Sequence, residues 1–149
     1  MPGGSLKHDD FSYEHRRGLQ GFRSKIVEVT SAEILALFTT PKTLVPAPGE
    51  GQTLIFDELK IEHRVAGTPV AYGGIAAGEE LVVKYENAAG AIASETQETT
   101  GWLDQTVGAT KWLRRLPAVT AVLNVFSENK ALVLHLLVGE ITTGTGTLV

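Results

Sequence analysis

Short strand-like segments, separated from one another by Gly, Pro or Asn, run through the chain after its first 24 residues. The longest, TLIFDELKIEHRV at 53–65, alternates between apolar and charged positions, which is the period of a half-buried β-strand. Its predicted inward set is Leu59, Ile61, His63 and Val65, and its outward set is Lys60, Glu62 and Arg64. Roughly seven to nine such strands predict an all-β protein, an antiparallel β-sandwich or jelly roll with one or two short helices.

The other predicted strands are short and end at turn residues. We expect them at 25–30, 42–46, 80–86, 120–126, 131–138 and 141–149, with a weaker one at 91–98. Pro46 and Pro48 suit an edge position for the strand at 42–46, because proline cannot donate to a ladder. A turn at 127–130 would join its two neighbouring strands. The stretch 99–117 is ambiguous, since its first half allows a short helix and its second half an extended segment.

A capping box predicts one short helix. Thr30 is the expected N-cap, and the Glu33 side chain would reach back to the Thr30 amide. The helix would end before Pro41. Its apolar side would carry Ile34, Leu35, Leu37 and Phe38. Two helical turns are not stable alone, so we expect this helix to close one end of the sheet stack.

The first 24 residues show no apolar period and mix glycine, charge and scattered aromatics. We interpret 1–24 as an extended N-terminal arm and 25–149 as one β domain, since 149 residues with 43% apolar content suffice for one core. Up to Lys25 the chain carries five basic and three acidic residues, against eight and fourteen in the remainder. The net charge of −4 disfavours general nucleic-acid binding, whereas a mildly basic arm suits an acidic protein surface.

The chain has no cysteine, which excludes disulfides and thiolate metal sites. Its N-terminus lacks the apolar core of a signal peptide. The longest apolar run, at 131–138, is far below the roughly 20 residues that a membrane-spanning helix needs. We therefore expect a soluble protein made in a cytoplasm, not secreted by a standard route, with no membrane or nucleic-acid partner.

The four histidines show no metal-binding spacing. His8 and His15 belong to the arm, while His63 and His135 stand singly in predicted strands without a carboxylate at ligand spacing. His135 lies in an apolar run, which favours a hydrogen-bonded core histidine. We therefore predict no metal site and no cofactor.

The Gly-rich and acidic segments favour structural roles over catalysis. APGEGQT at 47–53 lacks the lysine and the following helix of a phosphate-binding loop, so a turn with glycines at positive φ is favoured. The doublets at 57–58 and 79–80 lie on or beside predicted strands, where neighbouring side chains diverge, and we expect solvated charge at both. Without a nucleophile motif or a convergent carboxylate pair, we predict that the chain is not an enzyme.

Two tryptophans and two arginines form the remaining cluster of interest: Trp102, Trp112, Arg114 and Arg115. Tryptophan and arginine are enriched at the centres of protein interfaces, so one hypothesis places these residues at a subunit interface. The alternative is that both indoles plug the ends of the sandwich.

Several short motifs follow one another in a characteristic order. KIVEVTSAEILALFTTPKTLVPAPGEG at 25–51 precedes YGG at 72–74, LVVKYEN at 81–87, GWLDQT at 101–106 and GTGTLV at 144–149. This series resembles a family of tailed-bacteriophage structural proteins that includes head decoration (cement) proteins. The resemblance covers residues 25–149, and the arm lies outside it.

The resemblance implies a β-sandwich or jelly-roll domain that is commonly trimeric and binds the outer surface of the capsid without catalysis. The implied partners are the major capsid protein and further copies of the chain, and the implied location is the virion. The arm would then bind neighbouring capsid subunits through its aromatic and basic residues: Phe11, Tyr13, Arg16, Arg17, Phe22 and Arg23.

Two other function classes stay open on the residues alone. A phage tail or tail-tip β-sandwich with an adhesive role would use Trp102 and Trp112 to stack on sugar rings. A jelly-roll enzyme would need histidine and carboxylate ligands that converge, and the sequence shows no such set.

Overall fold

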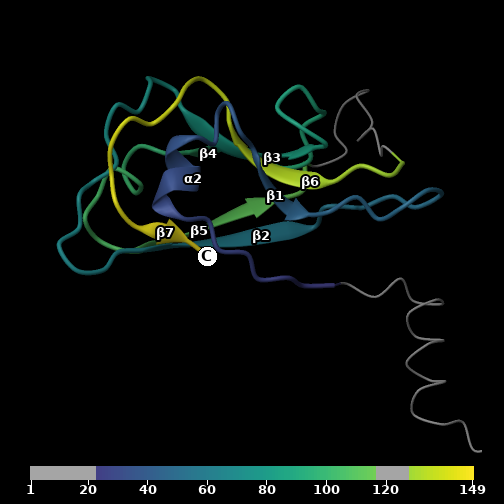
Figure 1. Cartoon of the computed structure of the whole chain (residues 1–149), viewed down its shortest axis with the longest axis horizontal. Helices are drawn as coiled ribbons and strands as arrows, with labels where there is room; N and C mark the ends of the chain where they lie inside the picture. Colours follow the sequence, from purple (N-terminus) through teal and green to yellow (C-terminus); the bar gives the residue numbers. More distant parts are fainter. Residues whose placement is uncertain (1–22, 117–127) are drawn as a thin grey trace, which may run out of the picture.

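Two antiparallel β-sheets pack against each other in the computed structural model of this chain, which describes residues 23–116 and 128–149 (Figure 1). The larger sheet has the strand order β1-β6-β3-β4, and the smaller sheet has the order β5-β2-β7. In chain order the elements are α2 (Ser31–Leu35), β1 (Lys42–Val45), β2 (Glu58–Arg64), β3 (Glu80–Tyr85), β4 (Gln97–Glu98), β5 (Ala109–Arg114), β6 (Leu132–Leu136) and β7 (Thr147–Leu148). The predicted all-β class and antiparallel sandwich are confirmed, and β1 is the edge strand that its prolines predicted.

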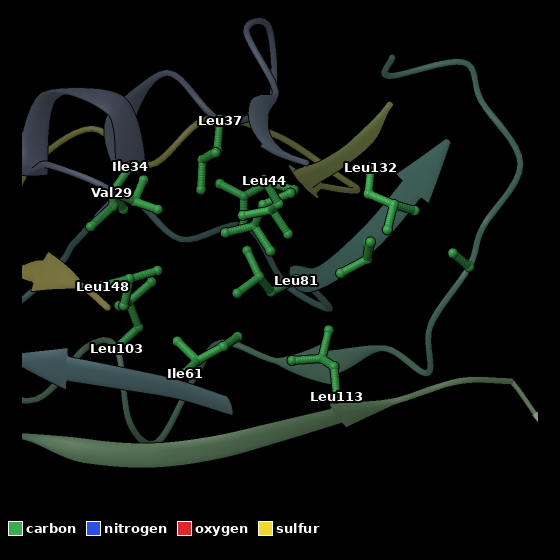
Figure 2. Packing of buried hydrophobic residues seen from close by; sticks show 14 of the residues in the cluster. Val29, Ile34, Leu37, Leu44, Ile61, Leu81, Leu103, Leu113, Leu132 and Leu148 are labelled. Atoms are coloured by element: carbon green, nitrogen blue, oxygen red, sulfur yellow. The ribbon is translucent and has the colours of Figure 1, made fainter. Parts of the chain in front are cut away.

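The hydrophobic core lies between the two sheets. Figure 2 shows Ile61 and Leu113 of the smaller sheet pointing toward Leu81 and Leu44 of the larger one. All four are at most 7% exposed. Burying an aliphatic side chain of this size stabilises the fold by about 1.5–3 kcal/mol. The alternation predicted for 53–65 is confirmed within β2, whose inward residues are buried or half-buried while the alternate set reaches solvent.

The larger sheet is covered on both faces around β6, since all five residues of that strand are buried. Leu132, Leu134 and Leu136 belong to the core between the sheets. On the opposite face, the His135 ring stacks on Phe38 with centroids 5.9 Å apart, and its Nε2 lies 3.0 Å from the Phe38 carbonyl oxygen. The prediction of a hydrogen-bonded core histidine at 135 is therefore confirmed.

The predicted capping box starts α2. The Thr30 amide donates to Glu33 Oε2 over 2.8 Å, and the Glu33 amide donates to the Thr30 hydroxyl over 3.4 Å. The helix is five residues long, and turns continue the chain to Pro41. Ile34 is fully buried where α2 contacts β7. In the described ranges, no helix has the length and apolar character needed to cross a bilayer.

The Gly-rich segment after β1 is a turn, as predicted. Gly49 and Gly51 have φ values of 110° and 73°, which glycine adopts without strain. The Gly49 amide donates to Asn129 Oδ1 over 3.0 Å, and the Gly51 amide donates to Glu128 Oε1 over 2.6 Å. Since the chain itself supplies acceptors for these amides, the segment is not an open phosphate cradle.

Several predictions about strands are wrong in part. Within 91–98 and 141–149 the strands of the described structure are only Gln97–Glu98 and Thr147–Leu148, with isolated bridges at Ile92, Ser94 and Thr143. Among residues 23–116 and 128–149, the segment 25–30 finds a pairing partner only at Val29, which bonds with Leu148 in both directions over 2.8 and 3.0 Å. Residues 53–57 precede β2 without forming a strand, apart from a bridge at Thr53. Of the possibilities left open for 99–117, residues 101–107 form turns and bends and not a helix, with Gly101 at a φ of 84° and its amide held by Asp104, while the second half is extended in β5. The strand predicted at 120–126 lies outside the described residues.

Candidate interaction surface

Trp112 stands on the outer face of the smaller sheet, where its side chain is 48% exposed. It lies on β5 directly opposite Lys60 of β2. The Arg115 amide donates to the carbonyl of Asp57, the residue opposite it, over 2.9 Å. Because hydrogen-bonded and non-hydrogen-bonded pairs alternate along an antiparallel ladder, the hydrogen-bonded pairs are those of the odd-numbered residues of β2. The Lys60–Trp112 pair is thus a non-hydrogen-bonded pair, in which side chains approach most closely. Lys60 and Trp112 are therefore direct cross-strand neighbours on this face.

Charged side chains surround this indole on the same face. Arg114 is paired with Glu58, so opposite charges face each other across the two strands. Further along β2, Glu62 accepts from Lys60 and from Arg64, the latter over 2.7 Å from Nη2 to Oε2. We define the Trp112 face as Trp112, Arg114, Glu58, Lys60, Glu62 and Arg64.

Glu62 stays ionised throughout the physiological pH range. Hydrogen bonds from Lys60 and Arg64 lower its pKa from 4.5 to about 2. Ion pairs as exposed as these contribute little to folding stability. The charges on this face therefore affect the binding of a partner more than they affect the folding stability of the sheet.

Trp102 lies apart from this face, in the core of the chain. Its side chain is 2% exposed, and Nε1 donates to the Glu98 carbonyl over 2.6 Å. The ring packs edge-on against His63 with centroids 6.3 Å apart. Of the two tryptophans, Trp102 therefore takes the plugging position of the alternative interpretation, and Trp112 reaches the surface.

Arg114 and Arg115 are both exposed but point to different faces of the smaller sheet, because they are neighbours on an extended segment. Arg115 forms a bridge with Ser94, and the Glu95 amide donates to the Arg114 carbonyl over 2.7 Å. This connection joins the smaller sheet to the segment that runs beside β3 in the larger one. The four residues predicted as one cluster are thus divided, with Trp112 and Arg114 together on the Trp112 face.

Of the predicted arm residues, the structure describes Arg23 alone, and it is exposed. The others lie outside the described residues: Phe11, Tyr13, Arg16, Arg17 and Phe22. The exposed apolar residues away from the Trp112 face belong to several separate segments. They are Ile26, Ile55, Val70, Ile92, Val107 and Val138.

The described residues contain no group of three or more His, Asp or Glu side chains that could hold a metal ion. His63 and His135 are both buried but belong to different sheets.

Glu79 corrects the expectation of solvated charge at 79–80, since its side chain is fully buried. Its carboxylate accepts from three consecutive backbone amides, those of Leu137 (2.8 Å), Val138 (3.0 Å) and Gly139 (2.6 Å). A buried carboxylate is tolerated where such donors replace water. Local sequence could not show this arrangement, because the donors lie nearly 60 residues away and form a turn only in the folded chain.

Comparison with family models, with curated proteins and with solved structures finds no match to this chain.

Proposed function

We propose that this chain is a decoration (cement) protein of a tailed-bacteriophage head, a binding protein with no catalytic role. It would bind the outer surface of the capsid and stabilise contacts between subunits of the major capsid protein. The ordered motif series of the sequence motivates this assignment. The observation in the fold that supports it best is the Trp112 face, which presents a half-exposed indole among fixed charges on a regular sheet.

The Trp112 face has the composition of an interface centre. Large aromatics next to arginine carry most of the binding energy in many protein interfaces. We propose that it packs against a further copy of the chain in a homotrimer, while the N-terminal arm binds neighbouring capsid subunits. Each subunit would then join several partners, so that release from the capsid requires several contacts to break together.

One deletion and one substitution test this proposal. Deleting residues 1–24 should leave the oligomer folded but greatly weaken binding to stripped or expanded capsids, measured by co-sedimentation. Trp112→Ala should instead weaken self-association by at least about 30-fold, which corresponds to a hot-spot contribution of about 2 kcal/mol. Thr110→Ala, on the same strand and face, is the matched control. Capsid binding that is unchanged by the deletion would contradict the role of the arm.

A phage tail or tail-tip protein that binds glycans is the second candidate. One exposed indole on a sheet face with polar neighbours is compatible with stacking on a sugar ring. The burial of Trp102 removes the second indole from such a platform. A glycan array that gives hits with the natural chain and none with Trp112→Ala would favour this candidate over capsid binding.

A further inference from the structure

His63 is buried beneath the last segment of the chain without a hydrogen-bond partner. It is 3% exposed, and within the described residues neither ring nitrogen has an acceptor or donor in hydrogen-bond geometry. Its ring packs against those of Tyr72 and Trp102, with centroids 5.8 and 6.3 Å away. A Cβ at Gly146 would approach His63 Nε2 to 2.9 Å, so the backbone of the last segment lies directly on the imidazole.

Among the described residues, no charged side chain is positioned to compensate the positive charge that this imidazole would gain on protonation. The neighbours on β2, Glu62 and Arg64, point to the opposite face and pair with each other. Across the sheet, His63 is opposite Ala109 of β5 and Leu148 of β7, which are both apolar.

The other titratable groups near this end of the sandwich are already engaged. The Tyr72 hydroxyl donates to the Gly146 carbonyl over 2.9 Å. In the 101–107 turns, Asp104 accepts from the Gly101 amide, and beside α2 the Glu33 carboxylate binds Lys42 and Thr30. An imidazolium at position 63 would therefore be an uncompensated buried charge.

The same end of the sandwich holds both the last segment and the start of α2. Leu148 is paired with His63 on one side and with Val29 on the other, through two bonds to Val29. Val29 immediately precedes the N-cap Thr30. Because Leu148 is held by β2 on one side and by Val29 on the other, a displacement of β7 would disturb both pairings, including the one at which the N-terminal segment joins the domain.

We propose that His63 is an acid-sensitive latch, whose protonation opens the pairing of residues 147–149 with β2 and releases Val29 from Leu148. This inference is independent of the proposed capsid function, because it rests on groups inside the domain. Its direct consequence is that the attachment of the N-terminal segment depends on pH.

The direction of the pH dependence follows from burial. Burial lowers the pKa of His63 below the ordinary value of 6.5, and the backbone of Trp102, close by but outside hydrogen-bond geometry, only partly opposes this shift. The open form then binds a proton more readily than the closed form. The opening constant is therefore lowest above pH 6.5, and it rises by up to about tenfold per pH unit as the pH falls toward the lowered pKa.

His135 is the matched control. Burial lowers its pKa as well; the Phe38 carbonyl and the Glu79 charge oppose this shift, and the Lys84 charge adds to it. It lies in the larger sheet, however, where its Nε2 meets the Phe38 carbonyl, and it has no connection to β7. Protonation of His135 should therefore leave the Val29–Leu148 pairing intact.

Amide hydrogen exchange of the full chain between pH 7.5 and 5.0 tests the latch. We expect the opening constants at Val29 and Leu148 to rise below pH 6.5, by up to about tenfold per pH unit, measured relative to His63→Phe at each pH to remove the pH dependence of exchange chemistry. His135→Phe should retain the rise. Equal pH dependence in the natural chain and His63→Phe would overturn the proposal, as would loss of the rise in His135→Phe.

A measurement without substitution covers the case in which His63→Phe does not fold. Titration of the natural chain, followed by the ring signals of His63 in NMR, should show protonation of His63 coupled to loss of the Leu148 amide signal of the closed form. A His63 ring that titrates near pH 6.5 while the Leu148 signal is unchanged would contradict the latch. His63→Gln, which is polar but does not titrate, should behave as His63→Phe does.

Discussion

The two sheets of this protein differ in how their faces are covered. In the larger sheet, every residue of β6 is buried and the Phe38 ring covers the outer face at His135. In the smaller sheet, one face packs on the core and the other presents Trp112 between charged side chains. The larger sheet is thus the internal scaffold, and the smaller sheet is the one that offers a surface to a partner. Substituting the same residue type should therefore change the free energy of unfolding by different amounts at buried and at exposed positions.

The two tryptophans, one buried in the core and one on the outer face of the smaller sheet, give the largest expected contrast. Trp102→Ala should reduce the free energy of unfolding by about 3–5 kcal/mol, because it leaves a cavity beside His63 and removes the bond to Glu98. Trp112→Ala should change it by less than about 0.5 kcal/mol at a concentration where the chain is monomeric. Urea unfolding of both variants measures the contrast. Similar losses in the two would show that the indoles are equally important to the fold.

Buried Glu79 is expected to be the second most sensitive position. Glu79→Ala leaves the amides of Leu137, Val138 and Gly139 without their acceptor. Since each orphaned buried donor costs about 1–3 kcal/mol, we expect a loss of at least about 3 kcal/mol in the free energy of unfolding.

The neighbouring Glu80 is the control for this substitution. It is only partly buried and accepts from the Thr96 hydroxyl. Glu80→Ala should therefore lower stability by less than about 1 kcal/mol. If the two substitutions had equal effects in urea unfolding, the three-amide arrangement would not be the reason that Glu79 is buried.

The capping box of α2 gives a smaller effect. Thr30→Ala should cost about 1 kcal/mol, because the Glu33 amide loses its acceptor. Hydrogen bonds from Lys42 and Thr30 lower the pKa of Glu33 from 4.5 to about 2.

This lowered pKa predicts how the Glu33 contribution changes with pH. Its stabilisation is present above pH 4.5 and is lost as the pH falls toward 2, and it is small because the Glu33 side chain is 39% exposed. Thermal unfolding of Glu33→Gln and the natural chain should therefore converge over this range. A constant difference between them down to pH 2 would contradict the assignment to the carboxylate.

Local patterns in the sequence predicted the parts of the fold that depend on neighbouring residues. The alternation of β2 reflects the two-residue period of a strand, and the Thr30–Glu33 box depends on residues three positions apart. The turn at Gly49 and Gly51 follows from the freedom of glycine at positive φ. These features depend only on residues that are close in the sequence, so the predictions made from local patterns are confirmed.

The same local patterns failed where a pairing partner was needed. The segment 25–30 has strand-like composition, yet only Val29 meets a partner among the described residues. For the same reason, the order β5-β2-β7 and the placing of β1 at an edge beside β6 depend on contacts far apart in the chain.

The candidate site divides in the same way. Composition alone selected Trp102, Trp112, Arg114 and Arg115 as residues of interest, and their types determine what chemistry a surface here could offer. Only the tertiary structure decided that Trp102 belongs to the core and that Trp112 and Arg114 share an exposed face. It also decided that Glu79 and His63 are buried, the first with three backbone donors and the second without a hydrogen-bond partner in the described part of the chain. Burial and partnership are set by segments that are distant in the sequence, so no local pattern contains them.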